Sequence, residues 1–402
     1  MMDWLFGVVG LSLWVPIVFT LVMTHLTFVA ITVYLHRHAA HRALELHPAL
    51  KHVFRFWLWV TTGMSTKEWV AVHRKHHAFT ETPQDPHSPA IEGLAEIVFK
   101  GVKHYRKGIT PETMRVYGKG TPDDWLERNV YVTREFTGIG AFLVLDLILF
   151  GVSGLLVWGV QMLWVPFWAA GVINGIGHAW GYRNFECPDH AKNIVPWGIL
   201  ICGEELHNNH HTYPNSPKLS VKPWEIDFGW TWIRLFEMCG LAKPNRVGPV
   251  ATKDLSKQEL DLDSVIALAN DRFNVMAKFG SKVVSPLVRA QYQANLANRS
   301  RRLLRRAKSV ICRNDKALSA SELRRLEEIK KLFPTLETVY SLRVRLSEVW
   351  SKRTGNKADV YEALGEWCQQ AESKLRDLGH IDELQSFISE LKYYATPQTS
   401  TT

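Results

Sequence analysis

Hydrophobic and polar positions divide the chain into an apolar part, which ends near Gly240, and a charged part that follows it. Between Trp4 and Leu35 the only strongly polar side chain is His25, and between Thr137 and Trp180 the only charged one is Asp146. One helix needs ~20 residues to cross ~30 Å of hydrocarbon, so the first run is too long for one span and tight for two. Each run therefore predicts a transmembrane hairpin.

Glycine and charge positions predict how these hairpins turn and face. We expect turns near Gly7, Gly10 and Pro16 in the first run, and near residues 159–161 in the second. Basic residues flank the hairpins and are absent from both turns; they are Arg37, Arg42, Lys51, Arg55, Arg134, Arg183 and Lys192. By the positive-inside rule, the polar mass and both termini are expected in the cytoplasm. A soluble protein with two buried hairpins is the weaker alternative, because uncharged runs this long are rare in soluble cores.

Two further apolar segments, 53–64 and 194–202, are too short to span, and each leads into a histidine cluster. We expect both to be helices that lie on the membrane face or dip into it. The pattern as a whole predicts an all-α integral membrane protein. It would have four transmembrane helices in two hairpins and a cytoplasmic helical cap.

The charged part of the chain predicts a separate helical region. The expected domains are a membrane domain over residues 1–245, a cytoplasmic helical extension over 246–395 and a disordered tail over 396–402. Within the extension, periodicity predicts helices over 261–273, 317–332 and 339–352, with a break at 354–356. Ser319 to Glu322 offers a start for the second of these helices.

The net charge and the cysteines limit the partners and sites that this chain is expected to have, but they do not single one out. A formal net charge of +9 suits a phospholipid surface, a phosphate-bearing substrate or nucleic acid. The five cysteines form no CxxC pair, which argues against a disulfide framework and against a thiolate metal site. The 17 histidines are unusual, because most of them cluster.

Three histidine clusters and one shorter motif carry the candidate chemistry. They are His36-Arg37-His38-Ala39-Ala40-His41, His73-Arg74-Lys75-His76-His77, Asn174-Gly175-Ile176-Gly177-His178 and His207-Asn208-Asn209-His210-His211. Helical positions i, i+3 and i+4 lie on one face, so each H-x-x-H-H presents three imidazoles together. Imidazole suits iron, zinc, copper and nickel. About nine imidazoles exceed one four-ligand zinc site, so two ions with open positions are predicted.

Helix geometry leaves the first cluster open. His36 and His41 do not share a face of an ideal α-helix, whereas His38 and His41 do. The isolated histidines are expected to be surface or hydrogen-bonded core residues; they are His25, His47, His52, His104, His190 and His380, with His87 a weaker case.

The clusters, in this order, resemble those of the membrane fatty acid desaturases, especially the delta-9 acyl-CoA (stearoyl-CoA-like) branch of bacterial type. The flanks Glu68-Trp69, Asp85-Pro86-His87-Ser88 and Gly203-Glu204-Glu205-Leu206 agree, and the likeness covers residues 11–240. It implies two iron ions held by His36, His41, His73, His76, His77, His178, His207, His210 and His211, with Asn174 holding one iron through a water. It thereby favours His36 over His38.

The resemblance also implies a reaction. A cis double bond, at the delta-9 position, would enter a long-chain acyl thioester such as acyl-CoA. O2 would be the co-substrate, and a separate donor of ferredoxin or flavoprotein reductase type would supply electrons. A phospholipid acyl chain is the alternative substrate, because Val70-Ala71-Val72 replaces a charged stretch that acyl-CoA members tend to have.

Further residues are assigned supporting roles. Glu68 and Asp85 are expected to orient ligating imidazoles. Lys100, Lys103, Arg106 and Lys107 are candidates for contacts with a substrate phosphate, with a solvated basic face as the alternative.

Two alternative functions are weaker than the desaturase, and the sequence also predicts partners and a location. A histidine-rich membrane hydroxylase shares di-metal chemistry, but the spacing and flanks favour a desaturase. A metal sensor or transporter would need polar residues inside the spans, which offer little beyond Asp146 and Asn174. The basic stretch 289–308 suits anionic lipid or an acidic electron donor, and no nucleic-acid partner is expected. The expected location is a bacterial inner membrane.

Overall fold

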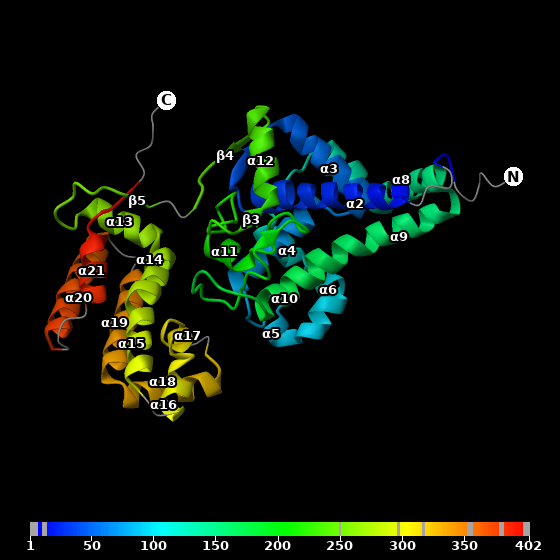
Figure 1. Cartoon of the computed structure of the whole chain (residues 1–402). Coiled ribbons are helices and arrows are strands. Elements are labelled where there is room, and N and C mark those ends of the chain that lie inside the picture. Colours follow the sequence, from blue (N-terminus) through cyan, green and yellow to red (C-terminus); the bar gives the residue numbers. More distant parts are fainter. Residues whose placement is uncertain are drawn as a thin grey trace. The chain divides into compact units, whose positions relative to one another are not determined.

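The chain folds into helices that form two compact units (Figure 1). This computed structural model describes residues 7–9, 14–248, 251–295, 298–315, 318–351, 357–377 and 382–396. The first unit comprises Met1–Arg183 and Asp189–Gly248, and the second comprises Asn184–Pro188 and Pro249–Thr402. The all-helical class predicted from the sequence is confirmed, apart from three short two-stranded pairings.

Two helical stretches of the described residues are long and apolar enough to cross a membrane, Trp14–Ala40 and Glu135–Ala179. The first consists of α2 (Trp14–Val29) and the π-helix η1 (Ala30–Ala40). The second consists of α8 (Glu135–Phe150), η3 (Gly151–Ser153), α9 (Gly154–Val165), η4 (Pro166–Ile173) and α10 (Asn174–Ala179). Large apolar side chains such as Leu21, Leu156 and Leu163 are exposed along them, as expected for a lipid-facing surface.

The first predicted hairpin is not found among the described residues, which hold one membrane-length helix in that region. Pro16 does not turn the chain but lies in the first turn of α2, where its missing amide hydrogen costs no helical hydrogen bond. Gly7 is part of a turn, after which the amides of Val8 and Val9 donate to the carbonyls of residues 148 and 149. Gly10 lies outside the described residues.

The second run is a hairpin, but it turns earlier than predicted. The indole nitrogen of Trp158 on α9 donates to the Ile139 carbonyl on α8, at 3.3 Å, so these two helices lie side by side. The turn lies at Gly151–Ser153 and not at residues 159–161. Gly151 adopts φ +61°, which favours glycine, and a Cβ on Gly154 would lie 2.2 Å from the Asp146 carbonyl oxygen. These two glycines therefore fix the turn.

One of the two short apolar segments is helical and the other is not. Residues 53–62 belong to α3 (Pro48–Thr62), as expected. The predicted helix over 194–202 is wrong, because that segment forms turns and the short strand β2 (Trp197–Gly198). Pro196 lacks an amide hydrogen, and Cys202 and Gly203 have φ of +53° and +98°, so an α-helix cannot continue through them.

The first unit contains further helices and short strands besides the two apolar stretches and α3. The helices are α4 (Thr66–Phe79), α5 (Pro89–Glu92), α6 (Leu94–Gly108), α7 (Pro111–Tyr117), η2 (Glu127–Tyr131), α11 (His207–Thr212) and α12 (Phe228–Met238). Strand β1 (Leu44–Leu46) pairs antiparallel with β4 (Ala242–Pro244), and β2 pairs parallel with β3 (Ile226–Asp227).

Glycines bring α6 against the last apolar helix. A Cβ on Gly101 would lie 2.3 Å from the Ala170 carbonyl oxygen, and a Cβ on Gly171 would lie 2.3 Å from that of Val98. Only hydrogen fits at either position, so the two backbones touch. This crossing fixes α6 beside η4, at the wall of the cavity described below.

The second unit is a helical bundle. Its helices are α13 (Leu262–Asn270), α14 (Arg272–Phe279), η5 (Gly280–Val284), α15 (Ser285–Ala294), α16 (Asn298–Leu304), α17 (Ala307–Ile311), α18 (Ala320–Leu332), α19 (Pro334–Ser351), α20 (Lys357–Asp377) and α21 (Asp382–Leu391). Strands β5 (Thr252–Lys253) and β6 (Tyr394–Ala395) pair antiparallel. The core is apolar and includes the mutually packed rings of Phe279, Trp367 and Phe387.

Two of the three helices predicted for the charged part are confirmed with shifted ends, as α18 and α19, whereas the predicted helix over 261–273 is divided at Asp271 into α13 and α14. Ser319 and Glu322 form a capping box at the start of α18, as the sequence suggested. The predicted break at 354–356 lies outside the described residues. So does most of the predicted disordered tail, except Thr396, whose amide and hydroxyl donate to the Asp263 carboxylate.

Candidate metal centre

Nine buried or half-buried imidazoles gather in the first unit as two neighbouring sets. The first set is His36, His41, His73, His77 and His210; the second is His76, His178, His207 and His211. Within each set, one nitrogen from every ring lies within 4.8 Å of the others. The sets are adjacent, since the ring centroids of His77 and His211 are 4.4 Å apart. These are the nine histidines that the family resemblance implied.

Each H-x-x-H-H motif lies on a helix and serves both sets. On α4, His73 and His77 contribute to the first set and His76 to the second. On α11, His210 contributes to the first set, whereas His207 and His211 contribute to the second. Neighbouring residues of one helix thus point to different sets, which holds the two sets side by side.

The π-helical geometry of η1 explains how His36 and His41 meet. The His41 amide donates to the His36 carbonyl, at 3.1 Å, in the i to i−5 pattern of a π-helix. Residues five apart then lie about one turn from each other, and the two ring centroids are 4.9 Å apart. His38 is excluded from both sets, because its Nδ1 hydrogen-bonds the Leu44 carbonyl at 2.9 Å. In an ideal α-helix His36 and His41 lie on different faces, so α-helical periodicity does not predict that they meet.

Four carboxylates orient four of the rings. The Nδ1 of His36 bonds Glu204 at 2.8 Å, that of His76 bonds Asp85 at 2.9 Å, that of His211 bonds Asp189 at 3.0 Å and that of His178 bonds Glu81 at 3.3 Å. A ring that donates from Nδ1 keeps its lone pair on Nε2. Each of these carboxylates therefore turns a ligating nitrogen toward the centre of its set.

The sequence found one of these carboxylates and missed three. Asp85 bonds a ring as expected, but no hydrogen bond joins Glu68 to a histidine in the part of the chain that the structure describes. Glu68 lies on the cavity wall, where burial and the nearby Glu135 raise the pKa of its carboxyl. Glu204 belongs to a flank quoted above, but Glu81 and Asp189 stand outside any motif. Glu81 adopts φ +62°, a backbone feature that sequence spacing does not reveal.

The donor set fits metal ions. The Nε2 atoms of His36 and His210, of His41 and His73, and of His178 and His207 lie only 2.8–3.0 Å apart. The buried Nε2 atoms of His76 and His211 have no hydrogen-bond partner among the described residues. Facing lone pairs and orphaned buried nitrogens are costly unless a cation lies between them.

Burial keeps several of these rings neutral. Desolvation, followed by the neighbouring imidazoles, lowers the pKa of His41, His73, His77, His207 and His210 well below the usual value. A neutral imidazole is the form that binds a metal. Five nitrogens in one set exceed the four of a structural zinc site, so the arrangement favours metals of higher coordination number.

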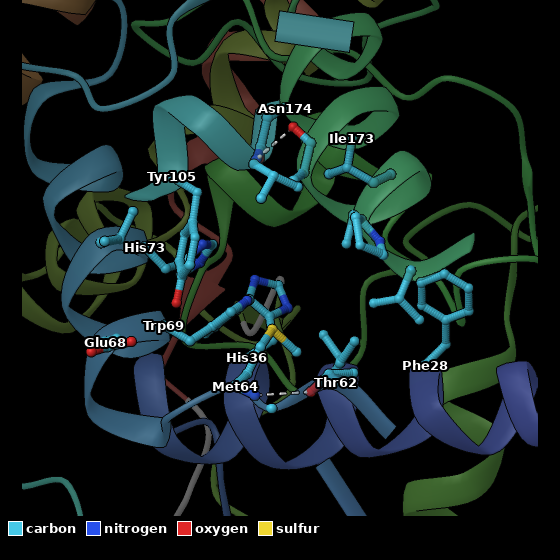
Figure 2. A pocket seen from close by; sticks show the side chains of 18 of the residues that line it. Phe28, His36, Thr62, Met64, Glu68, Trp69, His73, Tyr105, Ile173 and Asn174 are labelled. Atoms are coloured by element: carbon cyan, nitrogen blue, oxygen red, sulfur yellow. Dashed lines mark hydrogen bonds between the residues drawn. The ribbon is translucent and has the colours of Figure 1, made fainter. Parts of the chain in front are cut away.

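An apolar cavity of about 340 Å³ adjoins the centre. Figure 2 shows His36 and His73 on its wall together with Phe28, Met64 and Ile173. Asn174 also lines the cavity (Figure 2), as does His207 of the second set, and the Asn174 amide donates to the Ala170 carbonyl at 3.3 Å. The size and lining suit a mostly apolar ligand.

One part of the cavity wall is polar. Glu68, Tyr105, Arg106 and Glu135 line it there. A separate surface depression, lined by Val102, Lys103, Arg106 and Lys107, shares Val102 and Arg106 with the cavity. The fourth predicted basic residue, Lys100, lines neither of them; its ammonium donates to Glu96 at 2.6 Å.

Comparison with known proteins agrees with this centre. The family model "Fatty acid desaturase" matches residues 12–234, more than half of the chain, so the chain belongs to the fatty acid desaturase family. Its relatives include the Delta-9 desaturase-like 4 protein of Arabidopsis thaliana, 28% identical over 62% of this chain and 81% of that protein. Hex-5-enoyl-[acyl-carrier protein] acetylenase of Moorena producens is 32% identical over 54% and 73%. The sn-1 stearoyl-lipid 9-desaturase of Synechocystis is 30% identical over 55% and 68%.

The family makes the protein an oxidoreductase, and its two apolar helical stretches indicate membrane association. A second family model, described as a transposase, matches residues 265–397. That match covers a smaller part of the chain and falls within the helical bundle of the second unit.

Proposed function

We propose that the protein is an O2-dependent desaturase that inserts a cis double bond, at the delta-9 position, into a long-chain acyl group. One observation carries the proposal: nine imidazoles in two adjacent sets adjoin an apolar cavity. Desaturation needs an oxidant that no protein side chain provides, next to a dry space that holds a hydrocarbon chain.

Two iron ions are the proposed cofactors, one for each histidine set, and Asn174 would hold one of them through a water. The family generally uses a di-iron centre with O2, and both histidine sets are compatible with it. Bound iron would supply, from O2 and external electrons, the oxidising power that removes hydrogen from two adjacent methylenes.

The chain's own residues position the reactants. Glu81, Asp85, Asp189 and Glu204 hold ring nitrogens toward the centre. Trp69 stacks on His73, with ring centroids 4.8 Å apart, and restricts that ring from the cavity side. Apolar side chains such as Phe28 and Ile173 would pack along the acyl chain and exclude water from the reaction.

The acyl carrier, electron donor and location complete the proposal. A thioester such as acyl-CoA is the carrier expected from the resemblance, and a phospholipid is the alternative; relatives named acyl-lipid and acyl-CoA desaturases both occur. Lys100, Lys103, Arg106 and Lys107 would contact the carrier's phosphate. A ferredoxin or flavoprotein reductase would supply electrons. The protein would span a bacterial inner membrane with four helices and a cytoplasmic active site.

Fatty-acid profiling of a desaturase-deficient host tests this function. Expression of the full chain should produce a new cis-monounsaturated fatty acid, identified and located by gas chromatography with mass spectrometry. The variants His76→Ala and His210→Ala, one from each histidine set, should abolish it. An alcohol product would instead identify a hydroxylase. Bound iron with unchanged lipids would favour a sensor or transporter.

A further inference from the structure

A tenth buried imidazole, that of His87, lies beside the metal centre and belongs to neither histidine set. His87 is 4% exposed, and neither of its ring nitrogens has a hydrogen-bond partner among the described residues. It is therefore neither the surface residue nor the hydrogen-bonded core residue expected of an isolated histidine. Buried polar atoms without partners are costly, so these nitrogens point to a ligand that the chain itself does not supply.

The segment around His87 holds its ring against the second set. The His87 amide donates to a carboxylate oxygen of Asp85 at 3.1 Å, and the same oxygen bonds the Nδ1 of His76 at 2.9 Å. The rings of His76 and His87 stack, with centroids 4.5 Å apart. One carboxylate thus fixes both a ring of the second set and the segment that carries His87.

His87 lies close to the second set without being one of its potential ligands. One nitrogen of His87 lies within 4.8 Å of ligand atoms of His76 and Asp85. It does not belong to the group of mutually close nitrogens that defines the second set. An ion at the centre of that set would therefore be held by the four imidazoles, with His87 at its border.

The same residue lies at the border of the cavity. His87 lines the cavity together with Asn174 and with His207 of the second set. Helix α5, which begins two residues after His87, contacts α10, the helix that carries Asn174. An imidazole always carries at least one N–H, so His87 has a hydrogen bond to donate where the second set meets the cavity.

We propose that His87 donates a hydrogen bond to a small acceptor, such as water or an anion of a few atoms, that binds an ion of the second set from the cavity side. The second set has four nitrogens and the first has five, so an ion in the second set has the more open coordination. The inference rests on the proposed iron centre and adds to it a residue that holds a small ligand without holding the ion.

Azide binding tests this role without substrate or turnover. Azide is a small anion that binds at open positions of oxidised iron and changes its absorption. The oxidised, iron-loaded full-length protein is titrated with azide, and its iron is measured by mass spectrometry. His87→Phe keeps a ring beside His76 but has no nitrogen, so it should retain the iron and bind azide about tenfold more weakly. His87→Gln keeps a donor and should recover most of the azide affinity.

A matched control uses another buried histidine. His104 bonds Glu96 at 3.4 Å and does not line the cavity, so His104→Phe should bind azide like the wild type. If the larger ring at position 87 disturbs the fold, His87→Leu makes the same comparison with a smaller side chain.

The outcomes separate the inference from the proposed function. Equal azide affinity of the wild type and His87→Phe would overturn the inference, because His87 would then only fill space. Loss of iron from both His87→Phe and His87→Leu would also overturn it, because His87 would then hold the ion itself. Equal weakening by His104→Phe would show a general packing effect and overturn it as well. A wild-type chain without iron would contradict the proposed function and this inference together, whereas the three other results leave the proposed function standing.

Discussion

Both units have an apolar core, but among the described residues the first unit also encloses clustered histidines. The first unit encloses histidines and carboxylates, such as His76, His210 and Glu204, at its centre. The second encloses a largely apolar core around Phe279, Trp367 and Phe387. Burying a polar group is costly unless it is paired. The clustered histidines therefore lower the stability of the first unit unless they bind a metal ion. No described residue of the second unit belongs to a cluster of potential metal ligands. The difference assigns the chemistry to the first unit.

Removing one histidine from each set should have the largest effect. His76→Ala and His210→Ala should each lower the bound iron by about half and abolish product formation, because each removes a nitrogen from a different set. Metal analysis by mass spectrometry and fatty-acid profiling check this. His47→Ala serves as the control, since His47 belongs to neither set. Full iron occupancy in both variants would contradict the assignment of the two sets.

The two carboxylates predicted to orient imidazoles should behave differently. Asp85→Asn removes the charge that bonds His76 and should weaken iron binding roughly 10–100-fold. Glu68→Gln should leave iron binding near the wild-type value, because no hydrogen bond joins Glu68 to a histidine ring among the described residues. Competition with an iron chelator measures both. Equal weakening by the two substitutions would show that cavity electrostatics, and not ring orientation, governs iron affinity.

Substitutions in the second unit should change the stability of that unit and leave the iron content unchanged. Trp367 is almost fully buried and its indole nitrogen donates to the Leu342 carbonyl at 2.8 Å, so Trp367→Ala should lower the free energy of unfolding of this unit by about 3–5 kcal/mol. Leu332→Ala, at an exposed position, is the control. Limited proteolysis of the bundle reports its stability, and metal analysis should show unchanged iron in both variants. Loss of iron from Trp367→Ala would break the division of roles between the units.

Features that depend on neighbouring residues could be predicted from the sequence, whereas contacts between distant parts of the chain could not. The H-x-x-H-H spacing on α4 and α11 and the capping box at Ser319 depend on residues within one turn, so the sequence reveals them. The meeting of His36 with His41 required a π-helix, and the turn at Gly151 required a positive φ. Neither follows from α-helical periodicity.

The partners of the histidines were harder still to foresee. Glu204 lies 168 positions from His36, and Glu81 lies 97 positions from His178. Only the folded chain brings these side chains together, and no spacing rule connects them. Asp85 was found because it stands close to His76 in the sequence, in a flank shared with a known family.

The smallest expected effect lies at the start of α18. Ser319 accepts a hydrogen bond from the Glu322 amide at 3.3 Å, and the Glu322 carboxylate accepts one from the Ser319 amide at 2.9 Å. Ser319→Ala removes the first bond and should destabilise the second unit by about 1 kcal/mol. Ser319→Asp keeps an acceptor at the helix start and should retain most of the stability. Chemical denaturation followed by proteolysis of the bundle measures both.

Because this cap lies far along the chain from the histidine motifs, both substitutions should leave iron content and product yield unchanged. A Ser319→Asp variant as unstable as Ser319→Ala would mean that the side-chain acceptor does not stabilise this helix. A fall in iron content with either substitution would show that iron binding depends on the stability of the second unit. The division into a metal-binding unit and a purely structural unit would then be wrong.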